Sequence, residues 1–486
     1  MGLLNKLWQQ WHQTQDEATA VPVKADEDFH YAPHFIAGER LIVESHQVLE
    51  VVNPCNARAE RRLYVASAAT IQKAVQTAKE QGTSWAAYAY LQRLYVIEKF
   101  KNSFAVQPHI VTEVLRSESG LNEAEAAIEI EQTLEAIVYA LTAMQAKGSS
   151  TPAWGNTDVW VQHAMQPVGV VAIISNEAQS LKSLVSEIVV ALLCGNSLIV
   201  KPHSSQPLLP VLLGDWLAQS GLPLGVYNVI QGDDEVAKAL HVHPDVNAIT
   251  YVLANIPAKH AHMRQRQTIL AHNFIVVDED MDVEKVWAQY LASPKQRFTA
   301  PIWLVVGAGN AEALVHKWQN HLANLPAMVL PTEHSKARCS EFLQQAVSAG
   351  AELVVDGSQQ HLPEKGWHMG MSLLDHVLPE MALHLGAPSW GAVMLMRVPD
   401  LDAAIGVVNA TPDVGAACLF TESMTSMGLF KQQLQQVEVI SFNRVENVAS
   451  LNLPRGDISH QWAVGGQHAA RWHFYIRHQL IMGTAI

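Results

Sequence analysis

Apolar positions in the first part of the chain recur with the spacing of an α-helix. Over residues 66–105 they return every three or four positions, which places one apolar stripe on one helical face. That stripe comprises Ile71, Ala74, Val75 and Ala78. A second helical pattern covers residues 117–145, with Ser117 or Ser119 as the candidate N-cap. We therefore expect this part of the chain to be mainly helical.

The pattern changes after Pro167. The run VGVVAIIS is short and continuously apolar, as expected of a strand that is buried on both faces. Helical and strand-like segments then alternate as far as VNAITYV at residues 246–252. Strands separated by helices predict a parallel sheet in a doubly wound domain. Sheets of this kind bind ligands at the carboxyl ends of their strands.

A second α/β unit begins at FIVVDEDMD and continues through LFTES at residues 419–423. The tail ARWHFYIRHQLIMG alternates, with Trp472, Phe474 and Ile476 on one face. That alternation predicts an edge strand in need of a partner. The predicted fold class is therefore α/β, with two α/β units and a small β element.

Composition narrows the class of function. The chain has 486 residues, which is enough for two or three domains, and a formal net charge of −14. That charge argues against nucleic-acid binding, because neutralising phosphates needs clustered Lys and Arg. The four cysteines show no CxxC spacing and are expected to be reduced thiols. With no long apolar run and no secretory signal, the sequence predicts a cytoplasmic protein.

The first 13 residues place apolar side chains on one helical face, and a polar linker follows to about residue 30. The face comprises Leu4, Leu7, Trp8 and Trp11. A short helix that docks on its own domain or frays in solvent is the favoured interpretation, because the polar face has few cations. Contact of residues 1–13 with a membrane surface or a partner is the alternative.

Two His-x-His pairs are candidate metal ligands. They are His241 with His243 and His260 with His262. Neither pair is completed by a cysteine or a carboxylate at a recognisable spacing, so we expect surface histidines and no metal site.

Several segments, in the order in which they occur, resemble the aldehyde dehydrogenase superfamily over roughly residues 35–482. PVGVVAIIS, CGNSLIVKP, SGLPLGVYNVIQG and VNAITYV resemble the strands and turns of its cofactor domain. VVDEDMD, LDAAIGVVN and LFTES resemble its catalytic domain. Within the superfamily, SEIVVALLCGNSLIVKP and the tail HFYIRHQL are similar to the CoA-acylating methylmalonate-semialdehyde dehydrogenases.

The resemblance implies an aldehyde-dehydrogenase-like division of the chain. Residues 1–30 would be the amphipathic helix and linker. Residues 31–151 and 167–280 would form the Rossmann-like cofactor-type domain, and residues 281–465 the catalytic-type domain. Residues 152–166 and 466–486 would form a β element for oligomerisation.

The family's catalytic cysteine is replaced in this chain. In the family a cysteine thiolate follows Gly-Gln-Arg and attacks the aldehyde, whereas this sequence reads Lys295, Gln296, Arg297, Phe298. A phenylalanine has no lone pair for nucleophilic attack. The adjacent Thr299 would need a nearby base, and we do not expect it to substitute.

Other positions that the family uses are also changed. Ala178 stands at the oxyanion-hole asparagine and Thr268 at the frequent general-base glutamate, which the CoA-acylating branch also lacks. Where the family's glycine lets the cofactor phosphates approach, this chain has Leu253 and Ala254.

The Glu-x-Phe-Gly-Pro motif that holds the nicotinamide ribose aligns with a segment in which Ala387 and Ser389 replace the glutamate and phenylalanine. Lys201, at the position of the lysine that meets the adenosine ribose, remains as a vestige.

These substitutions favour a catalytically inactive homologue without catalytic residues or a cofactor. Such a protein would act as a subunit, a scaffold or a ligand sensor, as a homo-oligomer or with an active homologue. The alternative is an NAD-dependent semialdehyde dehydrogenase of the methylmalonate-semialdehyde type with an atypical active site.

Overall fold

The structure is a computed structural model, and it describes most of the chain. The described residues are 30–145, 159–177, 180–252, 264–269, 272–292, 302–360, 362–384, 391–412, 414–435, 437, 439–445, 462–463 and 474–484. The predicted N-terminal helix and the pair His260 and His262 lie outside them. No helix within these ranges is long and apolar enough to cross a bilayer.

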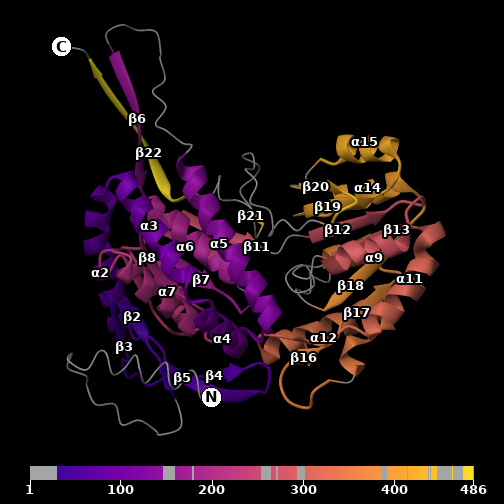
Figure 1. Ribbon diagram of the computed structural model, residues 1–486, viewed down its shortest axis with the longest axis horizontal. Helices are drawn as coiled ribbons and strands as arrows, with labels where there is room; N and C mark the ends of the chain where they lie inside the picture. The colour runs from indigo at the N-terminus through magenta and orange to yellow at the C-terminus, as the bar shows by residue number, and fades with distance from the viewer. Residues whose placement is uncertain are drawn as a thin grey trace.

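The first lobe is built around an eight-stranded sheet (Figure 1). Its strands lie in the order β21 (Trp462–Ala463), β11 (Arg264–Ile269), β10 (Ala248–Val252), β7 (Val170–Ser175), β8 (Ser197–Lys201), β9 (Tyr227–Val229), β2 (His34–Ile36) and β3 (Glu39–Leu41). The strands from β21 to β9 pair in parallel, and only β2 and β3 are antiparallel. This is the doubly wound sheet that the apolar runs predicted.

Helices cover both faces of this sheet. One face packs mainly against α3 (Tyr90–Ala105), α4 (Pro108–Ser119), α5 (Glu123–Gln145), α6 (Leu181–Leu193) and α7 (Leu208–Gln219). The other packs against α2 (Ala68–Ala87) and α8 (Asp234–Val242). The predicted stripe of Ile71, Ala74, Val75 and Ala78 is buried there. A small sheet of β1 (His30–Ala32), β5 (Arg58–Tyr64) and β4 (Val48–Asn53) lies at the edge of the lobe.

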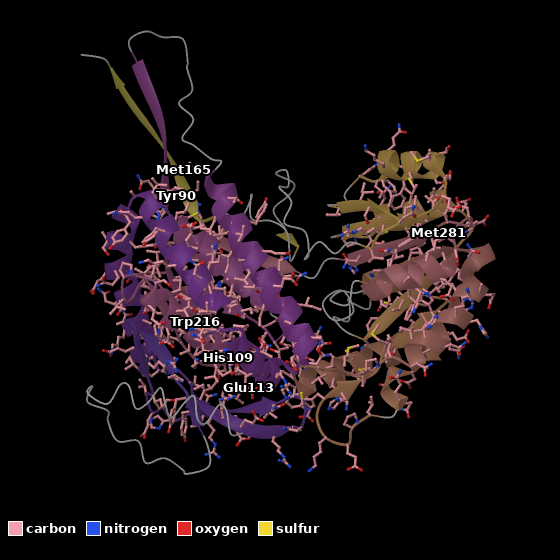
Figure 2. All side chains as sticks on the ribbon, in the orientation of Figure 1. Tyr90, His109, Glu113, Met165, Trp216 and Met281 are labelled. Carbon is pink, nitrogen blue, oxygen red and sulfur yellow. The ribbon has the colours of Figure 1, made fainter. Side chains whose placement is uncertain are left out.

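The second lobe has a seven-stranded sheet, drawn mainly in orange in Figure 1. Its order is β15 (Glu352–Val355), β17 (Ser372–Asp375), β18 (Ala392–Val398), β13 (Ile302–Gly307), β12 (His272–Val277), β19 (Val414–Phe420) and β20 (Val439–Phe442). The other elements are α9 (Val283–Ala292), α11 (Ala308–Ala323), α12 (Glu333–Ser348), α13 (Pro379–His384), α14 (Leu401–Ala410), α15 (Met424–Gln433) and the pair β14 (Met328–Val329) and β16 (His368–Met369). Trp216 lies in the core of the first lobe and Met281 in that of the second (Figure 2).

A two-stranded arm projects from the first lobe (Figure 1). It is formed by β6 (Val159–Pro167) and the C-terminal β22 (Ile476–Thr484), which pair antiparallel along their whole length. The tail is therefore a strand, as its alternation predicted, and its partner is β6. Met165 lies near the base of the arm (Figure 2).

The root of the arm is fastened by Tyr475, which is fully buried. Its hydroxyl donates a hydrogen bond to the carboxylate of Glu187 on α6 and lies 3.1 Å from Oγ1 of Thr250 on β10. Its carbonyl accepts hydrogen bonds from Nδ2 of Asn196 at 2.9 Å and from the backbone N–H of Val168 at 3.2 Å. One residue thus joins the arm, a helix and the sheet.

One predicted helix cap is wrong. Ser117 and Ser119 do not begin a helix but lie at the end of α4, which stops at Gly120 because this residue adopts a left-handed φ of 71°. Helix α5 begins instead after Asn122, whose Oδ1 accepts a hydrogen bond from the N–H of Glu125 at 3.0 Å. Strand β11 was not predicted either, because its sequence RQRQTI is mostly polar.

Replacing Tyr475 by Phe should lower the free energy of unfolding by about 1–3 kcal/mol, because the buried Glu187 loses a hydrogen-bond donor. The midpoint of urea unfolding should fall without a change in the slope. Tyr88→Phe, at a position 37% exposed, is the matched control and should leave the midpoint in place. Equal midpoints for both variants would contradict the anchoring role.

Candidate functional site

The candidate site lies at the carboxyl ends of the strands in the first lobe. From β7 the chain proceeds through β8 and β9 to one side, and β10 then pairs with the opposite side of β7. The strand order therefore reverses between β7 and β10, and crevices at such a point are the usual ligand sites of doubly wound sheets. The residues that follow β7, β8 and β9 are the relevant ones.

Lys201 ends β8 and is only 2% exposed. Burial lowers the pKa of its ammonium group, and the carboxylates of Asp234 and Asp233 partly oppose that effect. Among the described residues its ammonium finds no hydrogen-bond acceptor. A buried cation without a partner is costly, so this lysine is suited to hold a ligand with hydroxyl or anionic oxygens.

The turn after β9 presents carboxylates. Gly232 allows the turn with a φ of 155°, and Asp233 then caps α8 by accepting a hydrogen bond from the N–H of Glu235 at 3.0 Å. Asp234 and Glu235 occupy the first turn of the same helix. Helix N-termini attract anions, but here the chain's own carboxylates already supply the negative charge.

Glu177, two residues beyond β7, connects the two lobes. Its Oε1 accepts a hydrogen bond from Oγ of Ser335, in the first turn of α12, at 3.5 Å. Its Oε2 lies 3.9 Å from Nε2 of His203, which follows β8. Burial lowers the pKa of His203, and Glu177 opposes this. A carboxylate thus stands where the strand ends of the first lobe meet α12 of the second.

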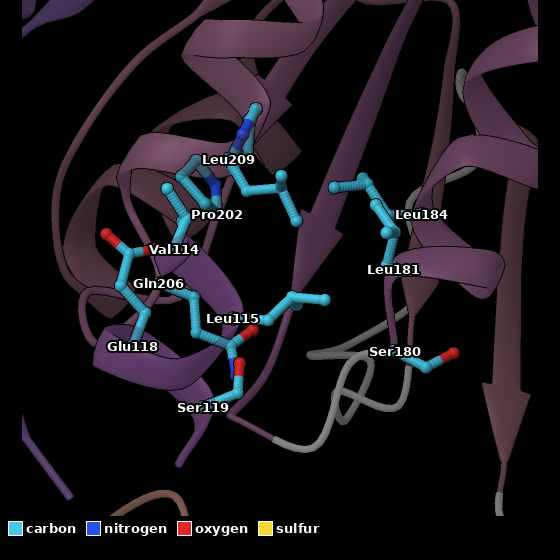
Figure 3. A pocket seen from close by; sticks show the side chains of 11 residues that line it. Val114, Leu115, Glu118, Ser119, Ser180, Leu181, Leu184, Pro202, Gln206 and Leu209 are labelled. Carbon is cyan, nitrogen blue, oxygen red and sulfur yellow. The ribbon is translucent and has the colours of Figure 1, made fainter. Parts of the chain in front are cut away.

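A small cavity lies beside this crevice, between α4, α6 and the start of α7 (Figure 3). Its volume of about 20 Å³ is room for roughly one water molecule. The lining is apolar from Val114, Leu115, Leu181, Leu184, Leu209, Pro202 and Pro210, with Ser119, Ser180, Gln206 and Glu118 as its polar members. The cavity is too small to be the ligand site itself.

Glu118 lines that cavity and is 1% exposed. Its carboxylate accepts a hydrogen bond from the N–H of Leu208 at 3.1 Å and so satisfies the first turn of α7. Burial raises the pKa of Glu118 to about 8, although the nearby guanidinium of Arg61 and the backbone hydrogen bonds act in the opposite direction. This glutamate has a structural role as a helix cap.

Of the positions singled out in the sequence, the structure describes the side chain of Lys201 and only the backbone of Thr268, which lies in β11. The remaining positions lie outside the described residues. They are Ala178, Leu253, Ala254, Phe298, Ala387 and Ser389. The interpretations of these residues stay predictions.

The expectation of surface histidines is wrong for His241, which is 2% exposed. Its Nδ1 is hydrogen-bonded to the hydroxyl of Tyr251, while Nε2 of His243 pairs with Gln72 at 3.0 Å. The two rings therefore serve different partners. No metal-binding group of three His, Cys, Asp or Glu side chains occurs within the described part of the chain. The four cysteines are free, as predicted.

Sequence reasoning missed Glu177, His203 and Glu118 as members of this region. Glu177 and His203 each follow a predicted strand, which is a usable signal for the edge of the sheet, whereas Glu118 stood at the start of a predicted helix and lies at the end of α4. The contact of Glu177 with Ser335, however, joins residues 158 positions apart and has no local signature.

Glu118 should make stability depend on pH. The unfolded chain releases this proton near pH 4.5, whereas the folded chain retains it to about pH 8. The contribution of Glu118 to the free energy of unfolding is therefore fully present below pH 4.5. It is lost as the pH rises to about 8, where the folded protein must carry a buried charge. Glu118→Gln keeps an acceptor for Leu208, so its melting temperature relative to wild type should rise over that window.

The matched control for this change is Glu98→Gln, at an exposed position of α3. Melting temperatures measured from pH 4.5 to 8.5 should run parallel for Glu98→Gln and wild type. A Glu118→Gln curve that also runs parallel to wild type would contradict the buried-carboxyl interpretation.

Comparison with known proteins identifies the relatives of this chain. A model of the aldehyde dehydrogenase family matches residues 42–469. The malonate-semialdehyde dehydrogenase of Pseudomonas aeruginosa is 27% identical over 428 residues, covering 83% of this chain and 86% of that protein. The Bacillus subtilis strain 168 enzyme of the same name is 24% identical over 424 residues, covering 82% and 86%.

Solved structures show the same fold. The methylmalonate-semialdehyde dehydrogenase of Oceanimonas doudoroffii has a TM-score of 0.82 at 23% identity, covering 94% of this chain and 98% of that one. A Thermus 1-pyrroline-5-carboxylate dehydrogenase with bound NAD has a TM-score of 0.81 at 17% identity, covering 94% of each chain. At these identities the likeness concerns the fold alone.

Proposed function

This chain belongs to the aldehyde dehydrogenase family, and we propose that it is a member without dehydrogenase activity. It would act as a subunit, a scaffold or a ligand sensor. The observation that supports this most strongly is Phe298, which follows Gln296 and Arg297 where the family has its nucleophilic cysteine. A benzyl side chain can neither attack an aldehyde nor hold an acyl intermediate.

The other substitutions act in the same direction. Ala178 lacks the side-chain amide that would stabilise an oxyanion, and loss of one such donor typically lowers a rate by about 10²–10³. Because Phe298 and Ala178 affect different parts of the reaction, restoring one leaves the other defect in place.

NAD, the cofactor of the family, fits the described crevice only in part. The unpartnered ammonium of Lys201 is suited to a ribose hydroxyl. The carboxylates of Glu177, Asp233 and Asp234 would repel a pyrophosphate that approached the strand ends. On charge grounds these residues do not fit a dinucleotide, so we derive no hydride-transfer step.

A second candidate is an NAD-dependent semialdehyde dehydrogenase with an atypical active site. The names of the relatives favour it, because the Pseudomonas aeruginosa and Bacillus subtilis proteins described above are malonate-semialdehyde dehydrogenases. Lys201, whose ammonium has no hydrogen-bond acceptor in the described part of the chain, is compatible with it as well. It requires a nucleophile other than a side chain at position 298, and the sequence offers no clear replacement.

Activity assays separate the two candidates. Purified protein with NAD and malonate or methylmalonate semialdehyde, with and without CoA, should produce no NADH above about 0.1 s⁻¹, against about 10 s⁻¹ for a typical enzyme. Phe298→Cys should stay below the same limit, because the oxyanion donor and the cofactor contacts are still missing. Turnover by wild type would establish the second candidate. Turnover by Phe298→Cys alone would refute our interpretation of the other positions.

We also propose that the arm of β6 and β22 mediates assembly, as a homo-oligomer or with an active homologue. Both outer edges of this two-stranded sheet lack a further strand among the described residues. An isolated hairpin is marginally stable in water, and an exposed edge invites pairing, so a symmetric contact would stabilise it.

Truncation after His478 should lower the oligomeric state. It removes most of β22 but keeps Tyr475 and the guanidinium of Arg477, which donates a hydrogen bond to the carbonyl of Val168 at 3.0 Å. Light scattering at micromolar concentration should show wild type as a dimer or tetramer and the truncated chain as a smaller species. A monomeric wild type, or an unchanged assembly after truncation, would show that the arm is not the contact.

A further inference from the structure

Glu177 lies in surroundings that suit an anion. Its side chain is 16% exposed and occupies the space between His203 of the first lobe and the first turn of α12 in the second. That turn is the positive end of a 16-residue helix, capped by Oγ1 of Thr332, which accepts a hydrogen bond from the N–H of Ser335 at 3.0 Å. The hydroxyl of Ser335 is directed at the carboxylate.

His203 adds a donor to this corner. Its Nδ1 accepts a hydrogen bond from the backbone N–H of Ser205 at 3.3 Å, so the neutral ring carries its proton on Nε2, the atom nearest Glu177. Glu177, Lys201, Asp234 and His334 are the charged and titratable groups that act on this imidazole. Burial lowers the pKa of His203, so Glu177 is not matched by a full charge on this ring near neutral pH.

Lys201 is the buried cation whose electrostatic effect reaches this corner through His203. It acts electrostatically on His203, and its buried ammonium has no acceptor among the described residues. A helix terminus, an imidazole N–H and a buried ammonium together form an environment that would bind a phosphate or carboxylate from solution. The only anion within contact distance of His203 and Ser335 among the described residues is the side chain of Glu177.

We propose that Glu177 is an internal anion that fills this cationic corner and excludes phosphate-bearing ligands from the crevice. The inference rests on the proposed function, because it supplies a reason why the crevice would not take a dinucleotide. Of the three carboxylates Glu177, Asp233 and Asp234, it assigns the largest part of the repulsion to Glu177, which lies against His203 and Ser335. Ligands that reach Lys201 in the wild-type protein are then neutral polyols, whose hydroxyl oxygens can accept from its ammonium.

Removal of the carboxylate should uncover an anion site. Inorganic pyrophosphate is the probe, titrated calorimetrically at constant ionic strength. Wild type should show no saturable heat. Glu177→Gln and Glu177→Ala should each give a saturable isotherm, with a Kd at least about tenfold below the weakest Kd that the wild-type titration could have detected. A factor of this size is typical of one removed charge at short range. Adding Lys201→Met to Glu177→Gln should abolish the gained binding, which places it in the crevice.

Glu333→Gln is the matched control, since it removes one carboxylate from the same turn of α12 at an exposed position. It should bind pyrophosphate no better than wild type. Circular dichroism of each variant establishes that it is folded. The proposal is overturned if the folded Glu177 variants gain no affinity, if wild type already binds, or if Glu333→Gln gains as much. Failure of the folded Glu177 variants to gain affinity overturns this inference alone. NADH production by wild type would refute the proposed function and, because NAD carries a pyrophosphate, the exclusion by Glu177 as well.

Discussion

The parallel pairing of β7 with β8 on one side and β10 on the other determines where chemistry can occur in this protein. It brings the ends of strands that are far apart in sequence to one edge of the sheet. Lys201, His203, Glu177 and the carboxylates of α8 meet there only because of this register. The same register places Thr250 beside the hydroxyl of Tyr475, so the root of the C-terminal arm is fixed to the sheet that forms the crevice.

Much of this architecture follows from local patterns. The continuous apolar run 170–175 predicted a strand buried on both faces, and the stripe of Ile71 and its neighbours predicted the buried face of α2. Local patterns failed where a distant partner decides the outcome. His241 is buried because its Nδ1 is hydrogen-bonded to the hydroxyl of Tyr251. β11 is a strand despite its polar sequence because it pairs in parallel with β10. The helix predicted from residue 117 begins only at Glu123, because the left-handed Gly120 ends α4, a helix that the apolar spacing did not predict.

In the candidate site, too, some features follow from the local sequence and others depend on residues far away in the chain. Replacement of a cysteine by Phe298 is visible in the sequence, because the flanking residues define the position. The environment of Glu177 is not, because it depends on Ser335 in the other lobe. Family membership and residue chemistry therefore give different information here. The relatives establish the family and the fold, whereas the proposal of an inactive member rests on Phe298 and on the side chains at the strand ends.

Titration of NAD into the wild-type protein, followed by isothermal calorimetry, tests the central claim most directly. A dehydrogenase must bind its cofactor, and typical affinities for such ligands would give a saturable curve at micromolar to millimolar concentration. The account predicts no saturable heat over that range, because the strand ends carry the carboxylates of Glu177, Asp233 and Asp234, and the latter two act on the buried ammonium of Lys201. A saturable isotherm with a micromolar Kd would contradict it and establish a cofactor-binding member of the family.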